Sequence, residues 1–146
     1  MKKDLRVIVC GGRSFANPTF QITTKEEFEQ NKIKAEEDIK LLYSILDYFH
    51  ETYGVVEMAA GAAIGADSAA ETYAKESQIP FVKFPVTKED WDTHGKKAGI
   101  LRNIKMLEQF KPDIVIAFPG GNGTENMCQE TKKRHVCLFK LTLDSR

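Results

Sequence analysis

The sequence has no apolar run of the roughly 18–20 residues that a membrane-spanning helix requires. Its first residues lead directly into a strand-like run, without the apolar core and small-residue cleavage site of a signal peptide. We therefore expect a cytoplasmic protein with no membrane partner.

Cysteine is scarce. The three cysteines, Cys10, Cys128 and Cys137, show no C-x-x-C spacing, which indicates neither a disulfide framework nor a zinc site. Cys10 and Cys137 lie in apolar runs and are expected in the core as small hydrophobic residues. We expect no metal site, and nothing in the sequence indicates a cofactor.

An excess of either charge is also absent, because Lys plus Arg and Asp plus Glu number 21 each. Nucleic-acid-binding proteins usually carry a basic excess, so a nucleic-acid partner is not favoured, although a local basic patch would not show in this sum. The chain has 146 residues, 42% of them apolar, which is enough for a single domain with its own core over residues 1–146.

Short apolar runs alternate with amphipathic stretches, a pattern typical of repeated strand–helix units. We predict a Rossmann-like, three-layer α/β domain with a five-stranded, mostly parallel sheet in the order 3-2-1-4-5. The polar stretch at about 16–34 is predicted to be an inserted loop or short element, either a functional lid or interface or an ornament. The expected strands cover residues 5–10, 55–60, 80–84, 113–118 and 136–141; the expected helices cover about 35–50 and 96–110, with two more ending near 78 and 133.

Three glycine-rich segments each follow a predicted strand: Gly11–Arg13, Gly61–Asp67 and Gly120–Thr124. In a parallel sheet such loops emerge at one edge, where ligands of this fold class bind. Glycine lets backbone N–H groups approach a ligand, and the start of the following helix attracts anions. The segments match neither the Walker A nor the G-x-G-x-x-G pattern, which disfavours a kinase, an NTPase or an ordinary dehydrogenase. They predict a phosphate site; tight turns and helix–sheet packing are the structural alternative.

Polar side chains near these loops complete the predicted site. The guanidinium of Arg13 would clamp a phosphate. Asp67 would either cap a helix or, if Ser68 and Glu71 form a capping box, accept hydrogen bonds from a ribose or position a water. The predicted ligand-binding residues are Gly11, Gly12, Arg13, Ser14, Gly65, Asp67, Arg102, Asn103, Pro119, Gly120, Gly121, Asn122, Gly123 and Thr124.

The predicted helix at 96–110 has two different faces. Glycine at position 99 costs roughly 1 kcal/mol relative to alanine within a helix, so we expect a ligand phosphate or a second subunit to approach this face closely. A second subunit there would make the protein a homodimer or a higher homo-oligomer. The alternative is a solvated polar face. Trp91 and His94 lie just before, on a predicted loop that would cover an adenine-like ring. The expected buried stripe contains Ile100, Leu101, Ile104 and Leu107, and the opposite face contains Lys96, Gly99, Arg102 and Asn103.

Four motifs follow one another along nearly the whole chain: Gly11-Gly12-Arg13-Ser14-Phe15, Gly61-x-x-x-Gly65-Ala66-Asp67, Trp91-x-x-His94-Gly95-x-x-Ala98-Gly99-x-x-Arg102-Asn103-x-x-Met106 and Phe118-Pro119-Gly120-Gly121-x-Gly123-Thr124-x-x-Met127. Together they resemble the SLOG superfamily of Rossmannoid domains, which includes sirtuin-like, TIR-like and lonely-guy-like members, and are most similar to its small YspA-like, YpsA-related branch. The resemblance implies binding or processing of a nucleotide-derived ligand, such as a nucleoside phosphate or an ADP-ribose-like molecule.

The lonely-guy phosphoribohydrolases resemble this chain in the Pro-Gly-Gly-x-Gly-Thr loop and in an arginine like Arg102, but their catalytic glutamate corresponds to Met127 here. A thioether cannot exchange protons as a carboxylate does. Helical geometry directs Glu125 away from that position and places Glu130 one turn further along. The candidate catalytic residues are therefore Asp67 and Glu130.

Three functions follow from these observations. The first is binding of a nucleotide-derived ligand by a sensor or sequestering module. The second is a hydrolase that cleaves the N-glycosidic bond of a nucleoside monophosphate or related nucleotide. The third, which the resemblance implies because some SLOG members handle single-stranded DNA, is association with single-stranded nucleic acid; the zero net charge disfavours it.

Overall fold

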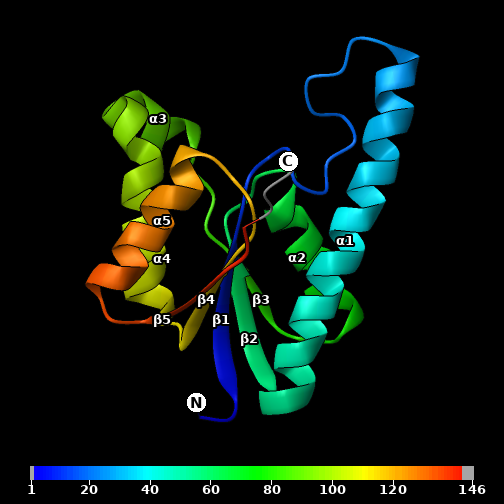
Figure 1. Cartoon of the computed structure of the whole chain (residues 1–146). Coiled ribbons are helices and arrows are strands. Elements are labelled where there is room, and N and C mark those ends of the chain that lie inside the picture. Colours follow the sequence, from blue (N-terminus) through cyan, green and yellow to red (C-terminus); the bar gives the residue numbers. More distant parts are fainter. Residues whose placement is uncertain (1, 143–146) are drawn as a thin grey trace.

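The computed structural model describes residues 2–142 and confirms the predicted sheet. Five strands, all parallel, lie in the order β3-β2-β1-β4-β5 (Figure 1). The strands are β1 (Leu5–Cys10), β2 (Val55–Ala60), β3 (Phe81–Lys83), β4 (Ile114–Ala117) and β5 (Cys137–Lys140).

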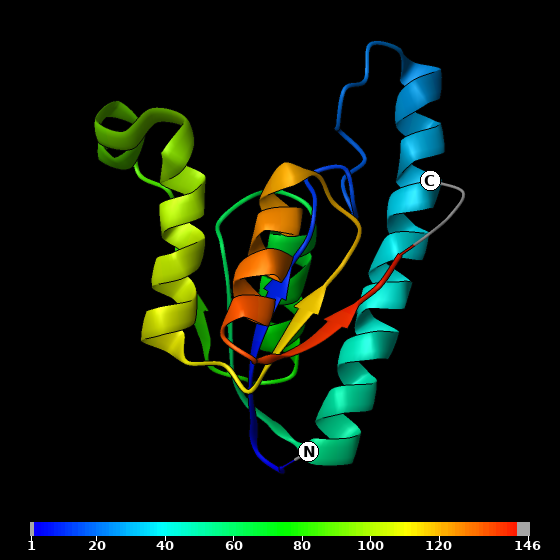
Figure 2. The same cartoon turned by 60° about the vertical axis from the view of Figure 1, so that its left-hand side comes forward.

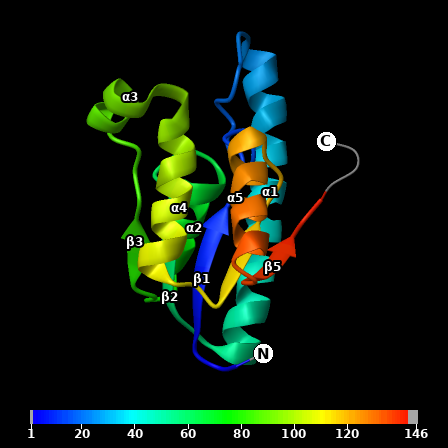
Figure 3. The same cartoon turned by 90° about the vertical axis from the view of Figure 1, so that its left-hand side faces the viewer.

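Helices cover both faces of the sheet and make the three predicted layers (Figures 1 and 2). Helices α1 (Lys25–Tyr53) and α2 (Ala66–Glu76) lie on one face, and α4 (Ala98–Phe110) and α5 (Asn122–Lys133) lie side by side on the other (Figure 3). The short helix α3 (Lys88–His94), followed by a 3-10 turn at Gly95–Lys97, lies beyond the carboxyl ends of the strands. None of the helices within residues 2–142 has both the length and the apolar character needed to span a bilayer.

The central strand β1 alternates its side chains between two hydrophobic cores, as a strand buried on both faces must. Val7 and Val9 pack with α1 and α2, whereas Ile8 and Cys10 pack with α4 and α5. In the register of β1 with β4, Cys10 lies beside Ala117, so both strands end at the same level of the sheet. The loops that follow β1 and β4 therefore start next to each other.

Helix α1 begins at Lys25, ten residues before the predicted start of a helix at about 35, so the segment at about 16–34 is a loop only as far as its N-cap, Thr24. The Thr24 hydroxyl accepts a hydrogen bond from the Glu27 N–H at 3.1 Å. The first turns project beyond the sheet (Figure 1), and Ile33 is 61% exposed. Because these turns face no core, their sequence contains no apolar stripe. The apolar periodicity therefore begins only at the first buried residue of the helix, Ala35.

The predicted buried stripe of α4 is wrong in part. Leu107 is buried as expected, but Ile100 and Leu101 are each 42% exposed. The helix instead turns inward a face that includes the polar Asn103, whose side chain finds hydrogen-bond acceptors on α5. The buried residues of α4 are Ala98, Asn103, Met106, Leu107 and Phe110.

Cys137 also differs from the prediction. It is exposed on β5, because β5 is an edge strand and buries little of its surface, whereas Cys10 is buried as predicted.

Candidate functional site

The loops after β1 and β4 pack directly against each other. The Gly12 N–H donates a hydrogen bond to the Pro119 carbonyl at 2.9 Å. A Cβ on Gly12 would lie 2.8 Å from the Gly120 Cα, and a Cβ on Gly120 would lie 2.6 Å from the Gly12 nitrogen. Next to this contact, the Phe15 and Phe118 rings stack with centroids 5.3 Å apart. Glycine is required at both positions because the two backbones touch.

A cavity of about 360 Å³, here called the glycine-loop cavity, opens beside this contact at the carboxyl ends of the strands. Most of the predicted ligand-binding residues line it, and they come from the loops after β1 and β4 and from α2, α4 and α5. The predicted residues that line it are Gly11, Gly12, Arg13, Asp67, Arg102, Asn103, Gly121, Asn122, Gly123 and Thr124.

Three predicted residues lie on the other side of the Pro119–Thr124 loop. Ser14, Pro119 and Gly120 line a separate cavity of about 440 Å³, which Thr124 shares with the glycine-loop cavity. This second cavity also contains Lys140, whose ammonium group binds the Glu125 carboxylate at 2.8 Å. Glu125 thus points away from the glycine-loop cavity, as its helical position predicts.

Gly65 supports the site without lining it. Its φ is +111°, and a Cβ there would lie 2.6 Å from the Gly12 carbonyl oxygen. Gly65 is also the N-cap of α2, and the Ser68 hydroxyl accepts a hydrogen bond from its N–H at 3.1 Å. The predicted capping box of Ser68 with Glu71 is therefore wrong: the helix begins earlier because Gly65 adopts the special backbone conformation, and Glu71 instead binds Lys83.

Asp67 lies in the first turn of α2 with its side chain in the cavity wall, and it is 7% exposed. Its Oδ2 accepts a hydrogen bond from the Ala63 N–H at 3.3 Å. Burial raises the pKa of Asp67 from 3.8 to about 6, against the opposing effects of the Arg102 charge and the Ala63 hydrogen bond. A carboxyl group with such a pKa can both take up and release a proton near neutral pH.

Arg102 is held in position by contacts to its neighbours. Its Nε–H donates to the Asn103 Oδ1 at 3.1 Å, and its Nη1 donates to the Phe84 carbonyl at 3.0 Å. Asn103 is 4% exposed, and its amide donates in turn to the Gly123 carbonyl at 3.2 Å and to Asn126 at 3.0 Å. Asn103 thereby ties the Arg102 guanidinium to the start of α5.

Arg102 and Asp67 face each other across Gly61. A Cβ on Gly61 would collide with the Arg102 Nη1 and lie 2.8 Å from the Asp67 Oδ2. Gly61 therefore lets a cation and an anion from different helices reach the same end of β2.

The start of α5 forms another wall of the cavity. Gly121 is the N-cap and offers no side-chain hydrogen bond, so the N–H groups of the first turn are not satisfied by a capping side chain. These amides and the helix dipole favour a bound anion. Arg13 also lines the cavity, and it is exposed to solvent.

Met127, at the position where the lonely-guy resemblance implies a glutamate, is buried and lines the cavity. Glu130 does not line it. The Glu130 carboxylate binds Arg134 at 2.8 Å and Lys133 at 3.1 Å, and these hydrogen bonds lower its pKa. The structure thus brings Asp67 to the predicted site but leaves Glu130 in an ion-pair cluster at the other end of α5.

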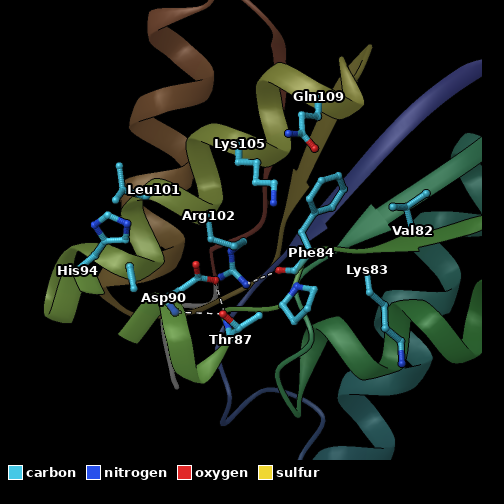
Figure 4. Close-up of a pocket in the computed structure, with 12 residues that line it drawn as sticks. Val82, Lys83, Phe84, Thr87, Asp90, His94, Leu101, Arg102, Lys105 and Gln109 are labelled. Atoms are coloured by element: carbon cyan, nitrogen blue, oxygen red, sulfur yellow. Dashed lines mark hydrogen bonds between the residues drawn. The ribbon is translucent and has the colours of Figure 1, made fainter. Parts of the chain in front are cut away.

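A larger cavity of about 630 Å³, here called the α3–α4 cavity, lies between the end of β3 and the helices α3 and α4 (Figure 4). His94 lines it, but on helix α3 and not on the predicted loop, since the Thr87 hydroxyl and the Asp90 carboxylate cap this segment as a helix. Trp91 is exposed and lies outside the cavity lining. A Cβ on Gly99 would meet nothing within 4 Å, so no described part of the chain approaches that face closely.

Sequence reasoning missed the α3–α4 cavity and six residues that line the glycine-loop cavity. Gly61 lies in one of the three glycine-rich segments, and its position directly after β2 is a signal that could have singled it out. The missed apolar residues carry no such signal because apolar side chains of core strands and helices look alike in sequence. The six are Val9, Cys10, Gly61, Ala63, Met106 and Met127. Within residues 2–142, no group of three His, Cys, Asp or Glu side chains is arranged to hold a metal ion.

Comparison with known proteins gives a family. Over residues 5–94 the chain matches the YspA, cpYpsA-related SLOG family. It is also similar to the Gene 61 protein of Mycobacterium phage D29, with 39% identity over an alignment of 100 residues that covers 64% of this chain and 77% of that protein. The family match covers the loops after β1 and β2 and ends before Arg102 and the Pro119–Thr124 loop. The chain belongs to the YspA, cpYpsA-related SLOG family.

Proposed function

We propose that this protein binds a nucleotide-derived ligand, a nucleoside phosphate or an ADP-ribose-like molecule, in the glycine-loop cavity, as a sensor or a sequestering module. Membership of the SLOG family suggests binding or processing of a nucleotide-related ligand. The observation that carries the proposal is the meeting of two glycine loops, the start of α5 and a fixed arginine around one cavity.

The phosphate would lie against the first turn of α5 and the guanidinium of Arg102. Both offer N–H donors, and Arg13 adds a second cation at the rim. The ribose would lie between the backbone of Gly11 and Gly12 and the carboxylate of Asp67, which accepts hydrogen bonds from hydroxyl groups. Two arginines against one aspartate leave the cavity with a positive charge, which suits an anionic ligand.

The proposal is tested first with a thermal-shift panel of ribose 5-phosphate, AMP, ADP-ribose, NAD and cyclic nucleotides. A ligand that binds only the native state raises the Tm, by an amount that depends on its concentration relative to Kd. If no member of the panel raises the Tm at millimolar concentration, the proposal is wrong.

We expect Arg102→Ala to weaken the ligand found in this panel by at least tenfold, because a charge-assisted hydrogen bond contributes about 1.5–3 kcal/mol. Isothermal titration calorimetry measures the change. Arg134→Ala is the control, since Arg134 binds Glu130 and Glu108 away from the cavity and should leave the affinity unchanged. Equal affinities of the Arg102 variant and the wild type would remove Arg102 from the site.

Cleavage of the N-glycosidic bond of a bound nucleotide is a second candidate function, and Asp67 is the observation that favours it. Its pKa of about 6 suits a general acid or base, and it lines the same cavity. Met127, in place of the glutamate that the lonely-guy resemblance implies, speaks against it. Chromatography of the nucleotide after incubation separates the two functions, because a hydrolase releases free base and a binding protein returns the ligand intact.

A further inference from the structure

The glycine-loop cavity and the α3–α4 cavity share one wall residue, Arg102. Its guanidinium lies between the end of β2, where Gly61 makes room for it, and the end of β3, where the Phe84 carbonyl accepts its hydrogen bond. Figure 4 shows this bond and the Arg102 side chain crossing toward Phe84. One cation therefore separates two spaces and can reach a ligand from either of them.

The hydrogen bonds of Arg102 leave part of its guanidinium available. Nε binds Asn103 and Nη1 binds Phe84, whereas Nη2 has no hydrogen-bond partner within residues 2–142. A guanidinium presents five N–H groups in a fixed plane, so a group held along one side still offers paired donors to an anion along the other. A phosphate or diphosphate next to Arg102 would satisfy them.

The α3–α4 cavity has the lining of a small-molecule site. Five of its twelve lining residues are apolar, and Lys105 adds a cation that forms no ion pair in the described part of the chain. The acidic group, Asp90, is already engaged as an acceptor of the Thr87 N–H at 2.9 Å. The volume of the α3–α4 cavity, about 630 Å³, falls in the range of ligand pockets, roughly 300–1,000 Å³. The apolar lining residues are Val82, Phe84, Pro85, Ala98 and Leu101.

We infer that the α3–α4 cavity is the second half of the ligand site and that the ligand is a two-part nucleotide, whose halves are joined by a diphosphate. The diphosphate would lie at Arg102, one half in the glycine-loop cavity and the other half, a sugar or a ring, between Leu101 and Lys105 on α4 and the end of β3. This inference rests on the proposed function and narrows its ligand class to compounds such as ADP-ribose, as distinct from nucleoside monophosphates.

The test compares AMP, ribose 5-phosphate and ADP-ribose by isothermal titration calorimetry, since ADP-ribose combines the two smaller compounds. We expect ADP-ribose to bind at least tenfold more tightly than either. Leu101→Ala should weaken ADP-ribose by about threefold or more, and Lys105→Ala by about tenfold. Neither substitution should alter the affinity for whichever of AMP and ribose 5-phosphate binds in the glycine-loop cavity. Ile100→Ala is the matched control, because Ile100 is as exposed as Leu101 on the same helix but does not line the cavity.

The outcomes separate the two proposals. If AMP or ribose 5-phosphate binds as tightly as ADP-ribose, or if the Leu101 and Lys105 variants keep the wild-type affinity for ADP-ribose, the two-part ligand is wrong while the proposed function stands. If none of the three compounds binds, this inference fails, and the proposed function fails with it only if NAD and the cyclic nucleotides of the thermal-shift panel also leave the Tm unchanged. Circular dichroism melts of each variant verify that a loss of affinity is not a loss of fold.

Discussion

At the scale of single residues, Asp67 combines the two properties expected of a chemically active group. It is buried, and it lies in a cavity wall close to a fixed cation. The sequence offered two roles for Asp67, helix capping or ligand contact; in the structure Gly65 is the N-cap, which leaves the Asp67 carboxylate directed at the end of β2. Only the structure shows how strongly burial acts on it, because desolvation depends on residues that are far apart in sequence.

The raised pKa of Asp67 predicts a pH dependence of stability. Its ordinary pKa is 3.8 and its pKa in the native state is about 6, so between pH 4 and 6 the native state binds more protons than the unfolded state. Stability from this group is therefore present at low pH and falls as the pH rises through that window, by up to about 3 kcal/mol. We expect Asp67→Asn to lack this fall and to be about 1–3 kcal/mol more stable than wild type at pH 7.5.

Urea unfolding of both proteins at pH 4.5, 6.0 and 7.5 measures the difference and cancels the contributions of all other titrating groups. A variant that is less stable than wild type at pH 7.5 would mean that the attraction of Arg102 for the Asp67 charge outweighs the cost of burying it.

At the scale of elements, the contact between the β1 loop and the β4 loop gives two of the three glycines in one sequence motif opposite roles. Gly120 touches the Gly12 backbone and the Thr124 side chain, whereas a Cβ on Gly123, in the first turn of α5, would meet nothing within 4 Å. The spacing Gly-Gly-x-Gly-Thr predicts a loop before a helix. The sequence does not distinguish a glycine that is required by a close contact from one whose position has room for a side chain.

We expect Gly120→Ala and Gly123→Ala to change stability in opposite directions. Alanine at 120 forces the two loops apart and should lower the free energy of unfolding by about 1–3 kcal/mol. Alanine at 123 should raise it by about 0.5–1 kcal/mol, since alanine loses less conformational entropy in a helix. Chemical denaturation measures both. Two variants of equal stability would contradict the close contact at Gly12.

At the scale of the whole molecule, the strands and the layers were predictable because apolar periodicity reports directly on burial. The sheet order β3-β2-β1-β4-β5 agrees with the prediction, and so does the burial of strands such as Ile114–Ala117. The predictions fail where the apolar pattern does not match the pattern of burial. Residues 25–34 form a helix that faces no core, and on α4 the polar Asn103 is buried. The α3–α4 cavity could not be predicted, because its volume depends on how the end of β3, α3 and α4 pack against one another, which apolar periodicity does not report.

The same contrast predicts a gradient of local stability across the molecule. The turns of α1 before Ala35 contain no buried residue and extend past the sheet, whereas β1 and β4 are central and buried. Backbone amides of residues 28–34 should therefore exchange with deuterium at least a hundredfold faster than those of β1 and β4. Hydrogen exchange followed by NMR or mass spectrometry measures this. Equal protection of both regions would show that something covers the start of α1 in solution.

The bonds that hold the Arg102 guanidinium join the end of β3, through the Phe84 carbonyl, to the start of α5, through Asn103. All of these bonds lie within the polypeptide, so the cation is oriented before any anion arrives. Binding of a ligand then needs little free energy to order the Arg102 side chain, and complex formation needs no slow rearrangement of the site. Differences in affinity among ligands should accordingly arise from how slowly each one leaves, and less from how fast it enters.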